Sequence, residues 1–323
     1  MKALRVDNNG LSLAEISRPE VEGEAFVRVL KSGICNTDLE IIRGYAKFRG
    51  TIGHEFVGMV EKADDQPELV GKRVVGEINT GCGICDLCRN GDPRHCPTRT
   101  VLGIHGRDGA HAEFLTLPAH NLLEVPELVS NEEAVFVEPL AAAYGITEQV
   151  EIGPDAKVAV IGDGKLGLLC AFCLSLKTKN LVLIGKHREK LAHAQRRGRD
   201  IGVFVAGDIR KLEKRFDVVV EASGSESGFA TALDLVRSRG KIVLKSTFHG
   251  MPTWEASRVV VDEITVVGSR CGRFQPALEL LVSKKVKVDE LISEEFELRN
   301  GLEAMNVAAN KGVLKVLLNM DQS

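Results

Sequence analysis

Two groups of metal-binding side chains lie in the N-terminal third of the sequence. One group is a cluster of cysteines within a short, glycine-containing segment. Four thiolates can close a tetrahedron around zinc, and such a site is structural because no position remains for water or substrate. The four expected ligands are Cys82, Cys85, Cys88 and Cys96.

The second group is of mixed composition. Cys35 offers a thiolate, and the adjacent residues His54 and Glu55 offer an imidazole and a carboxylate. Three such ligands leave zinc a fourth position, where a bound oxygen is acidified and polarised. In an extended segment, His54 and Glu55 would point to opposite sides. We therefore expect one of them to bind the metal and the other to be adjustable.

A glycine pattern in the second half of the sequence predicts binding of a dinucleotide. It follows an apolar strand and begins a helix, and its three glycines permit a tight turn, close approach of a pyrophosphate, and close helix packing. Unpaired N–H groups at the helix N-terminus then bind the anion. The expected contacts are Gly162, Gly164, Lys165, Leu166 and Gly167.

The end of the next apolar strand predicts which dinucleotide is bound. An acid there would hold the ribose 2′-hydroxyl of NAD, but the sequence has Gly185. The small Gly185 leaves room for a 2′-phosphate, and Lys186 and Arg188 offer cations to it. NADP is therefore expected to be preferred over NAD, and Gly185→Asp is expected to reverse the preference. The alternative is a solvated basic loop at the start of a helix.

The elements that carry these motifs are of two kinds. Up to about residue 135, short segments such as 25–30, 57–61 and 73–77, separated by glycine and proline, predict an all-β region. From about 140 to 270, apolar strands alternate with helices, as is typical of a parallel sheet covered on both faces. The expected strands there are 157–161, 181–184, 217–221, 241–244 and 264–267, and the expected helices 166–176, 189–197 and 228–238. A helix at 276–283 and a strand from 312 onward are expected in the tail.

Length and charge limit the class of protein. A chain of 323 residues exceeds the usual size of one core, which favours two domains. The net charge of -3 gives no reason to expect a nucleic-acid or membrane partner, and no apolar run approaches a bilayer span. No export signal is recognisable at the N-terminus. The eight cysteines are therefore read as thiols and metal ligands, and a cytoplasmic location is expected.

The sequence resembles the zinc-dependent medium-chain dehydrogenase/reductases over nearly its whole length. The motifs that carry the resemblance are Gly33-Ile-Cys35-Asn-Thr37-Asp38, Gly53-His54-Glu55-Phe-Val-Gly58, the cysteine cluster, Val137-Glu138-Pro139-Leu140 and the glycine pattern. The resemblance implies an α/β protein with a GroES-like β domain and a Rossmann doubly wound parallel sheet, and an active site in the cleft between them. The expected boundaries are 1–139 with a structural-zinc lobe at about 80–97, then 140–272, then a return of 273–323 to the first domain. It also implies a homodimer or homotetramer formed partly through the strand at 264–267.

The resemblance assigns the catalytic zinc to Cys35, His54, and either Glu55 or Glu138. In the alcohol dehydrogenase branch a cysteine stands at the place of Glu138, so the sequence is more similar to the polyol and sugar branch. A carboxylate in place of a thiolate makes the metal harder and more Lewis acidic. The alternative role of Glu138 is to stabilise the start of the following helix.

The resemblance also implies a path for the substrate proton. Thr37, expected on the same side of an extended stretch as Cys35, would receive this proton, because a threonine hydroxyl can both accept and donate. Many relatives carry a histidine five residues after the cysteine, where this sequence has Glu40. Glu40 either completes the path or faces water. Further contacts to the cofactor or substrate are expected from Ser223, Ser246 and Arg270.

Together these features predict an enzyme that reversibly oxidises an alcohol, polyol or sugar to a carbonyl compound. Zinc would bind the substrate hydroxyl and lower its pKa, Thr37 would pass on the proton, and the alkoxide would release hydride to the nicotinamide. The first alternative is a glucose-type sugar dehydrogenase, against which the short segment between Gly44 and Gly53 argues. The second is a non-catalytic nucleotide-binding sensor, against which the intact metal-binding set argues.

Overall fold

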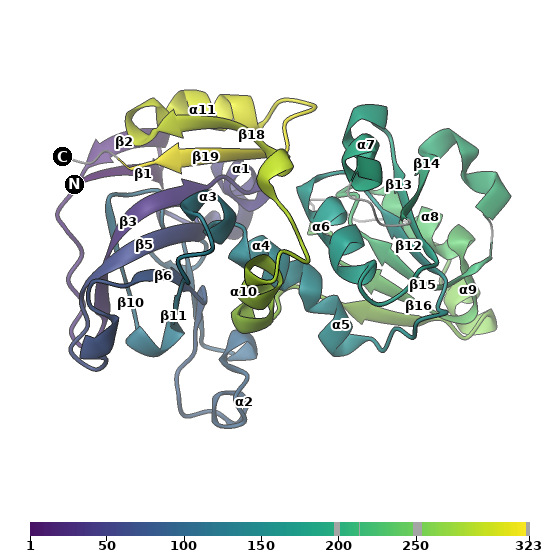
Figure 1. Ribbon diagram of the computed structural model, residues 1–323, viewed down its shortest axis with the longest axis horizontal. Helices are drawn as coiled ribbons and strands as arrows, with labels where there is room; N and C mark the ends of the chain where they lie inside the picture. Colours follow the sequence, from purple (N-terminus) through teal and green to yellow (C-terminus); the bar gives the residue numbers. More distant parts are fainter. Residues whose placement is uncertain (197–200, 213, 248–253, 321–323) are drawn as a thin grey trace. The chain divides into compact units, whose positions relative to one another are not determined.

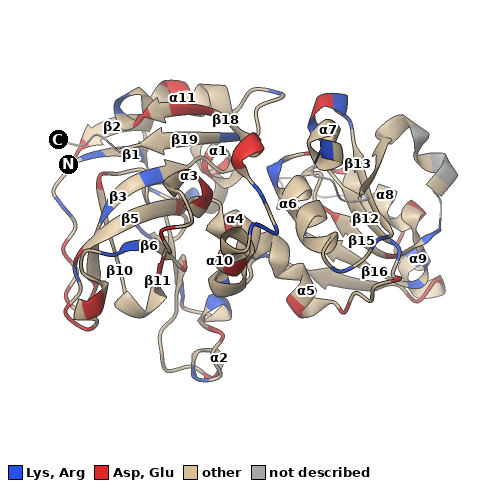
Figure 2. Cartoon of the chain, viewed as in Figure 1, with Lys and Arg blue, Asp and Glu red and all other residues tan. Residues whose placement is uncertain are grey.

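The chain folds into two units, which are visible in the ribbon of Figure 1. Residues 1–196, 201–212, 214–247 and 254–320 are described by the computed structural model. Unit 1 contains Met1–Glu138 and Phe274–Ser323, and unit 2 contains Pro139–Arg273. Basic and acidic residues are interspersed along both units (Figure 2). Within the described ranges, no helix is both long enough and apolar enough to cross a membrane.

Unit 1 is mainly β structure. Its 7-stranded sheet has the order β11-β6-β5-β3-β19-β18, with β10 also paired to β3, and two 3-stranded sheets have the orders β2-β1-β4 and β7-β8-β9. The central strand β3 alternates buried and half-buried residues along most of its length, as expected for a strand with one face on the core. The strands are β1 Lys2–Asp7, β2 Gly10–Glu15, β3 Ala25–Gly33, β4 Gly50–Thr51, β5 Glu55–Lys62, β6 Arg73–Gly76, β7 Asn79–Thr80, β8 Thr100–Leu102, β9 Gly106–Arg107, β10 Phe114–Leu117, β11 Leu122–Glu124, β18 Ile292–Glu297 and β19 Lys315–Asn319.

The helices of unit 1 are short and flank the sheets. They are α1 Asn36–Ile42, α2 Asp86–Arg89, α3 Asn131–Ala134, α10 Phe274–Val282 and α11 Gly301–Ala308. The C-terminal strand β19 lies antiparallel beside β3, with Leu317 opposite Gly33, and β18 is parallel to β19 (Figure 1). β18 and β19 therefore complete the 7-stranded sheet at the side of β3.

Unit 2 is a parallel sheet with helices between its strands. The order β14-β13-β12-β15-β16-β17 is that of a dinucleotide-binding fold, whose strand order reverses between β12 and β15. All four residues of β12 are buried, as in a sheet covered on both faces. The elements are β12 Val158–Ile161, α6 Lys165–Leu174, β13 Leu181–Gly185, α7 Arg188–Arg196, β14 Ile201–Val205, β15 Phe216–Glu221, α8 Ser227–Leu235, β16 Val236–Leu244, α9 Ala256–Val261 and β17 Thr265–Gly268, preceded by α4 Val137–Tyr144 and α5 Ile146–Gln149.

Two elements of unit 2 differ from the sequence-based expectation. The helix expected at 228–238 ends at Leu235, because Val236 already belongs to β16 and pairs with Phe216. The edge strand β14 is present in the structure but was not predicted from the sequence. Its only buried residue is Ile201, so it lacks the continuous apolar run that marks the inner strands.

Candidate metal and cofactor sites

Cys35, His54 and Glu55 converge on one point in unit 1. Their ligand atoms lie within 4.8 Å of one another. Cys35 directly precedes α1, and Glu55 begins β5, which is antiparallel to β3 with Glu55 opposite Gly33. Strand pairing thus brings together residues that are distant in the sequence. Glu138 is not part of this group of atoms in the described chain; it lies in the first turn of α4, where an acid favours the helix N-terminus.

The expectation that His54 and Glu55 point to opposite sides is wrong, because both contribute an atom to the same group. His54 precedes β5 and so does not follow the alternation of the strand. The chain turns at Gly53, whose φ of 97° is unfavourable for other residues, and a side chain there would meet the ring of His111 at 2.6 Å.

The buried polar atoms of this group fit a metal ion. Glu55 Oε1 is buried and has no hydrogen-bond partner in the described part of the chain. His54 Nδ1 is also buried, but it lies 3.4 Å from Asp38 Oδ1. Buried polar atoms are normally paired, so an unpaired carboxylate oxygen beside a thiol requires an explanation. A thiolate, an imidazole and a carboxylate are a donor set that zinc accepts.

The other carboxylate oxygen of Glu55 is bound by a lysine from the C-terminal strand. Lys315, the first residue of β19, donates to Glu55 Oε2, and both side chains are fully buried. The Lys315 ammonium also lies 5.4 Å from the ring centroid of Phe136. A side chain at Gly33, in the strand between them, would meet Glu55 Oε2 at 2.6 Å. The sequence gives no local signal for Lys315, because its partner lies near the other end of the chain.

Asp38 is a second residue that sequence reasoning did not select. It is fully buried, its Oδ1 lies 3.4 Å from His54 Nδ1, and its Oδ2 accepts from the backbone N–H of Cys35 at 2.8 Å. Oδ2 also lies 3.4 Å from His111 Nε2, whose ring is hydrogen-bonded to Ser32. Burial alone would raise the pKa of Asp38, but His54 and His111 hold this pKa well below its usual range.

The same interaction acts on the histidine. Burial alone would lower the pKa of His54, but the charges of Asp38 and Cys35 raise this pKa well above its usual value. The Asp38 carboxylate therefore orients the imidazole and stabilises positive charge on it, as carboxylates beside metal-binding histidines do.

Thr37 lies close to Cys35, but in a helix. Its Oγ1 is 3.7 Å from Cys35 Sγ, and both residues are at the start of α1. The expected extended stretch is replaced by a helical turn, closed by the Asp38 N–H donating to Cys35 O. Glu40 pairs with Arg43 at 2.7 Å, and 17% of its side chain is exposed. Both alternatives for Glu40, a place in the proton path and contact with water, stay predictions.

The four cysteines of the lobe also form one cluster, with their sulfur atoms within 4.8 Å of one another. The hydroxyl of Thr98, 3.5 Å from Cys96 Sγ, lowers the pKa of Cys96 to about 6, and the backbone N–H of Cys82 adds to this effect. Desolvation raises the pKa of Cys88 to about 11. Backbone hydrogen bonds from Ile84 and Cys85 lower the pKa of Cys82 as well. A cluster of four thiols, two of them with a lowered pKa, fits a closed zinc site.

The glycine loop of unit 2 has the backbone that a dinucleotide requires. Gly162 has a φ of 119°, and a side chain there would meet the carbonyl oxygen of Ala222. A side chain at Gly167 would meet the carbonyl oxygen of Gly162, so close packing of α6 needs a glycine. Around Gly164, a side chain would meet nothing within 4 Å, which leaves its backbone open to a pyrophosphate at the N-terminus of α6. Lys165 and Leu166 form the first turn of α6.

The loop after β13 differs from the expectation in one respect. Lys186 and Arg188 are exposed, as expected for cations that bind a phosphate. The space beside Gly185 that was expected to admit a 2′-phosphate is occupied by Asp163, however. A Cβ atom at position 185 would meet the carboxyl group of Asp163 at 2.5 Å. Asp163, the residue between the first two glycines, is therefore a third residue that sequence reasoning did not select.

The remaining expected contacts lie at the carboxyl ends of β15, β16 and β17. Ser223 Oγ donates to the buried Glu221 at 2.6 Å, and Ser246 Oγ accepts from the backbone N–H of Gly224 at 2.8 Å. Arg270 is exposed, and its carbonyl oxygen accepts from Lys245. Ligands of open α/β sheets bind at this edge of the sheet.

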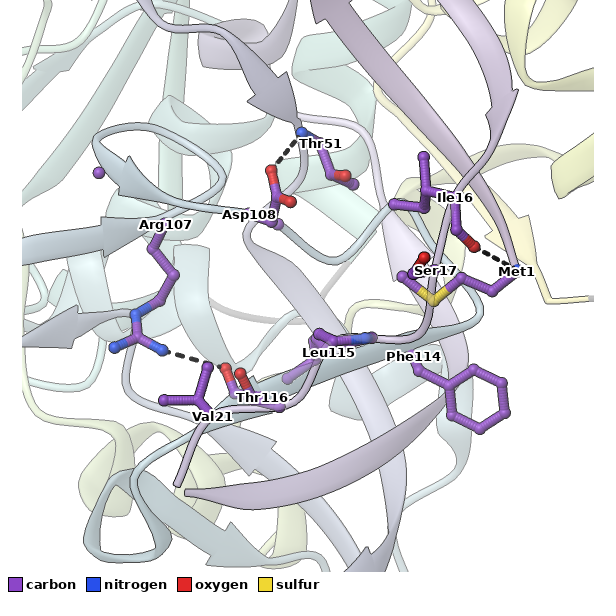
Figure 3. A pocket seen from close by; sticks show the side chains of 13 residues that line it. Met1, Ile16, Ser17, Val21, Thr51, Arg107, Asp108, Phe114, Leu115 and Thr116 are labelled. Atoms are coloured by element: carbon purple, nitrogen blue, oxygen red, sulfur yellow. Dashed lines mark hydrogen bonds between the residues drawn. The ribbon is translucent and has the colours of Figure 1, made fainter. Parts of the chain in front are cut away.

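A pocket elsewhere in unit 1 contains none of the expected site residues. It has a volume of about 330 Å³, and Arg107, Asp108 and Phe114 are among its lining residues (Figure 3). The polar groups there bind one another: Asp108 accepts from the Thr51 N–H at 2.7 Å, and the Met1 ammonium donates to the Ile16 carbonyl at 2.7 Å. The pocket therefore offers no chemistry comparable with that of the metal groups.

Comparison with known proteins shows the family of the chain. The alcohol dehydrogenase GroES-like domain matches residues 21–127, and the zinc-binding dehydrogenase domain matches residues 166–283. An erythritol/L-threitol dehydrogenase of Mycolicibacterium smegmatis is 30% identical, over 95% of this chain and 93% of its own.

Two solved structures are similar over almost the whole chain. One is a zinc-binding dehydrogenase of Sinorhizobium meliloti 1021 bound to NADP, with 27% identity, a TM-score of 0.88 and coverage of 98% of both chains. The other is an alcohol dehydrogenase of Escherichia coli CFT073 complexed with NADH, with 27% identity, a TM-score of 0.91 and coverage of 99% of both chains. The chain therefore belongs to the zinc-dependent medium-chain dehydrogenase/reductases and is an NAD(P)-dependent oxidoreductase of alcohols or polyols.

Proposed function

We propose that this enzyme reversibly oxidises a small polyol to a carbonyl compound at Cys35, His54 and Glu55, and that it prefers NADP(H). The convergence of these three residues, with Glu55 Oε1 buried and unpaired in the described chain, carries the proposal. The similarity to an erythritol/L-threitol dehydrogenase supports a polyol as substrate. In this proposal residues 1–139 and 273–323 form the catalytic domain, and 140–272 form the dinucleotide-binding domain.

Three residues are the ligands of the catalytic zinc in this proposal: Cys35, His54 and Glu55. Glu138 is the alternative carboxylate, and Cys82, Cys85, Cys88 and Cys96 hold a separate structural zinc. When bound, the catalytic zinc supplies Lewis acidity that lowers the pKa of the substrate hydroxyl. Lys315 holds Glu55 by Oε2, which leaves Oε1 as the donor atom.

The chain's own residues orient the substrate and accept its proton. Thr37 Oγ1, 3.7 Å from Cys35 Sγ, accepts the proton of the substrate hydroxyl and donates its own onward. Asp38 fixes the orientation of the His54 ring through the 3.4 Å contact with Nδ1. When bound, the nicotinamide supplies the hydride acceptor, and the glycine loop positions it through the pyrophosphate.

The preference for NADP(H) rests on the loop after β13. Gly185 provides no acid from that strand, and the exposed Lys186 and Arg188 form no ion pair with another described residue. Charge-assisted bonds to a 2′-phosphate then favour NADP(H) by about tenfold or more in kcat/KM. Replacing both Lys186 and Arg188 by alanine removes this preference.

We also propose a homodimer or homotetramer that pairs β17 with the same strand of a second copy. β17 is an edge strand, and Val266 on it is 40% exposed. On the preceding helix, Val260 and Val261 are 75% and 79% exposed. An apolar edge strand flanked by exposed valines is a template for pairing with another chain. Light scattering of the wild type and of Val266→Lys distinguishes an oligomer from a monomer.

The activity is tested by a screen of four- to six-carbon polyols, simple alcohols and aldoses with NAD and NADP, followed by the absorbance of the reduced nicotinamide. Oxidation of polyols is expected, and it should be lost in Cys35→Ser. It should be kept in the control Cys173→Ala, which removes a buried thiol of α6 that belongs to neither metal group. Activity on aldoses alone would indicate a sugar dehydrogenase instead. A folded, zinc-loaded protein that turns over none of these compounds would indicate a nucleotide-binding sensor.

A further inference from the structure

Asp163 places a buried carboxylate beside the loop that carries Lys186 and Arg188. It stands between the first two glycines of the dinucleotide loop, and the residue is 8% exposed. Its Oδ2 accepts from the backbone N–H of Lys186 at 2.7 Å and from that of His187 at 2.6 Å. The ring Nδ1 of His187 lies 3.1 Å from the same oxygen. Three groups of one loop therefore converge on a single carboxylate oxygen.

Two consecutive backbone N–H groups at the start of a helix form a binding site for an anion. Here they precede the nine-residue helix α7, at the end of β13 where the adenosine ribose of a dinucleotide is held. A 2′-phosphate would find these two donors already bonded to Asp163. It would then have to rely on the side chains of Lys186, His187 and Arg188.

The same carboxylate lies where an acid of β13 would stand. A Cβ atom built on Gly185 would meet both the Cβ and Oδ2 of Asp163 at 2.5 Å. The acid that is missing at position 185 in the sequence is thus present in space, contributed by a different strand-to-helix loop. Asp163 Oδ1 has only the His187 ring, at 3.2 Å, as a partner in the described part of the chain.

We propose that Asp163 is a cofactor-selectivity residue that limits the preference for NADP(H) and lets the enzyme also use NAD(H). Its carboxylate occupies the backbone donors that a 2′-phosphate would take and repels that phosphate, while it can accept from the 2′-hydroxyl of NAD(H). This inference deepens the proposed function: the cations of Lys186 and Arg188 favour the phosphate, and Asp163 opposes them.

The test measures binding of the adenosine half alone, without zinc, substrate or turnover. Dissociation constants of 2′,5′-ADP and 5′-ADP are determined by titration calorimetry for the wild type, Asp163→Asn and Asp163→Ala. Both variants should raise the selectivity for 2′,5′-ADP over 5′-ADP by roughly tenfold, the order expected for one like-charge contact near a protein surface. The matched control is Asp155→Asn, which removes an exposed carboxylate before β12, at the opposite edge of the same sheet. Its selectivity should equal that of the wild type.

Two outcomes would overturn the inference. An unchanged ratio in both variants would mean that the Asp163 charge does not act on the phosphate. A lower affinity for 2′,5′-ADP in the variants would mean that Asp163 only tethers the loop in a phosphate-binding shape. If Asp163→Asn does not fold, Asp163→Ala decides the matter, because it frees the N–H groups without adding an amide. A wild type that prefers 5′-ADP would contradict the proposed NADP(H) preference, but the change of ratio on substitution would still test Asp163.

Discussion

Lys315 donates a hydrogen bond to Glu55 Oε2 across the intervening strand, although the two residues are 260 positions apart in the sequence. The pair forms because β19 and β5 lie on either side of β3, and Gly33 of β3 has no side chain to separate them. Both partners are fully buried. The C-terminal segment therefore does more than complete the sheet: it holds one of the expected zinc ligands.

Replacing Lys315 by methionine is expected to destabilise the protein strongly. The substitution leaves the Glu55 carboxylate buried without its cation, which typically costs about 3–5 kcal/mol of unfolding free energy. Urea denaturation measures this loss. Lys315→Arg keeps the charge and should be less destabilising than Lys315→Met. If Lys315→Met unfolds at the same urea concentration as the wild type, the pair contributes nothing to stability.

The Asp38 carboxylate should strengthen zinc binding through His54. Burial alone would raise its pKa, but His54 and His111 keep the pKa low enough for Asp38 to be ionised at neutral pH. Asp38→Asn should lower zinc affinity at the Cys35 site by about 10- to 100-fold, as for other carboxylates that orient metal-binding histidines. Competition with a chromophoric chelator measures the affinity. Asp64→Asn, an exposed acid of the same unit, is the control; equal affinities in the two variants would argue against the role of Asp38.

An ion triad of the buried Lys31 and two partly exposed acids in unit 1 should make stability depend on pH. Lys31 Nζ lies 2.7 Å from Glu132 and 2.6 Å from Glu295. Burial opposes the charge of Lys31, but hydrogen bonds to the two acids raise its pKa above the ordinary 10.5. Burial likewise opposes the charge of Glu132, but Lys31 lowers its pKa below the ordinary 4.5.

The sign of the effect follows from these directions. The contribution of Glu132 is complete above its unfolded pKa and is lost as the pH falls through the lower folded value. That of Lys31 is complete below its unfolded pKa and is lost as the pH rises through the higher folded value. Lys31→Met should therefore cost about 1–3 kcal/mol between roughly pH 5 and pH 10, and less in acid. Urea denaturation across this range measures the loss, with Lys72→Met, at an exposed lysine, as control. If the loss of unfolding free energy in Lys31→Met does not change with pH, the triad does not make stability depend on pH.

The cysteine lobe should contribute to stability rather than to chemistry. Cys88→Ser is expected to lower the thermal midpoint or the integrity of the oligomer more than it lowers turnover per folded molecule, because a closed zinc site stabilises the fold. If Cys88→Ser keeps its stability but loses turnover, the cysteine lobe is the catalytic site and the Cys35 group the structural one.

Metal analysis should find up to two zinc ions per chain, and a chelator should first remove the one at Cys35 and His54.

Gly185→Asp alone is not expected to convert the enzyme to NAD, contrary to the prediction from the sequence. The new side chain would meet Asp163 at 2.5 Å and place two carboxylates together, so the single variant should bind both cofactors poorly. Combining Gly185→Asp with Asp163→Gly removes the contact and leaves one acid at the end of β13. The double variant should prefer NAD in kcat/KM. A single variant that folds and prefers NAD would show that Asp163 moves aside freely.

Residues that are close in the sequence could be assigned from the sequence alone. The spacing of the cysteines predicts a cluster, and the four sulfur atoms do lie together, because a short segment has few ways to separate them. The alternation of apolar strands and helices predicts the parallel sheet of unit 2, since burial on both faces imposes a continuous apolar pattern. The glycine pattern likewise reflects local backbone geometry, as at Gly162.

Only the tertiary structure decided which distant side chains meet. Lys315 reaches Glu55 through the pairing of β19 with β3, and Asp163 reaches the loop after Gly185 through the parallel pairing of β12 with β13. Neither contact has a local signature, because a lysine in a strand or an aspartate in a loop is ordinarily solvated. The sequence therefore determined which groups are available for chemistry. Strand pairing determined which of them are buried together, where the low dielectric makes each charge depend on its neighbour.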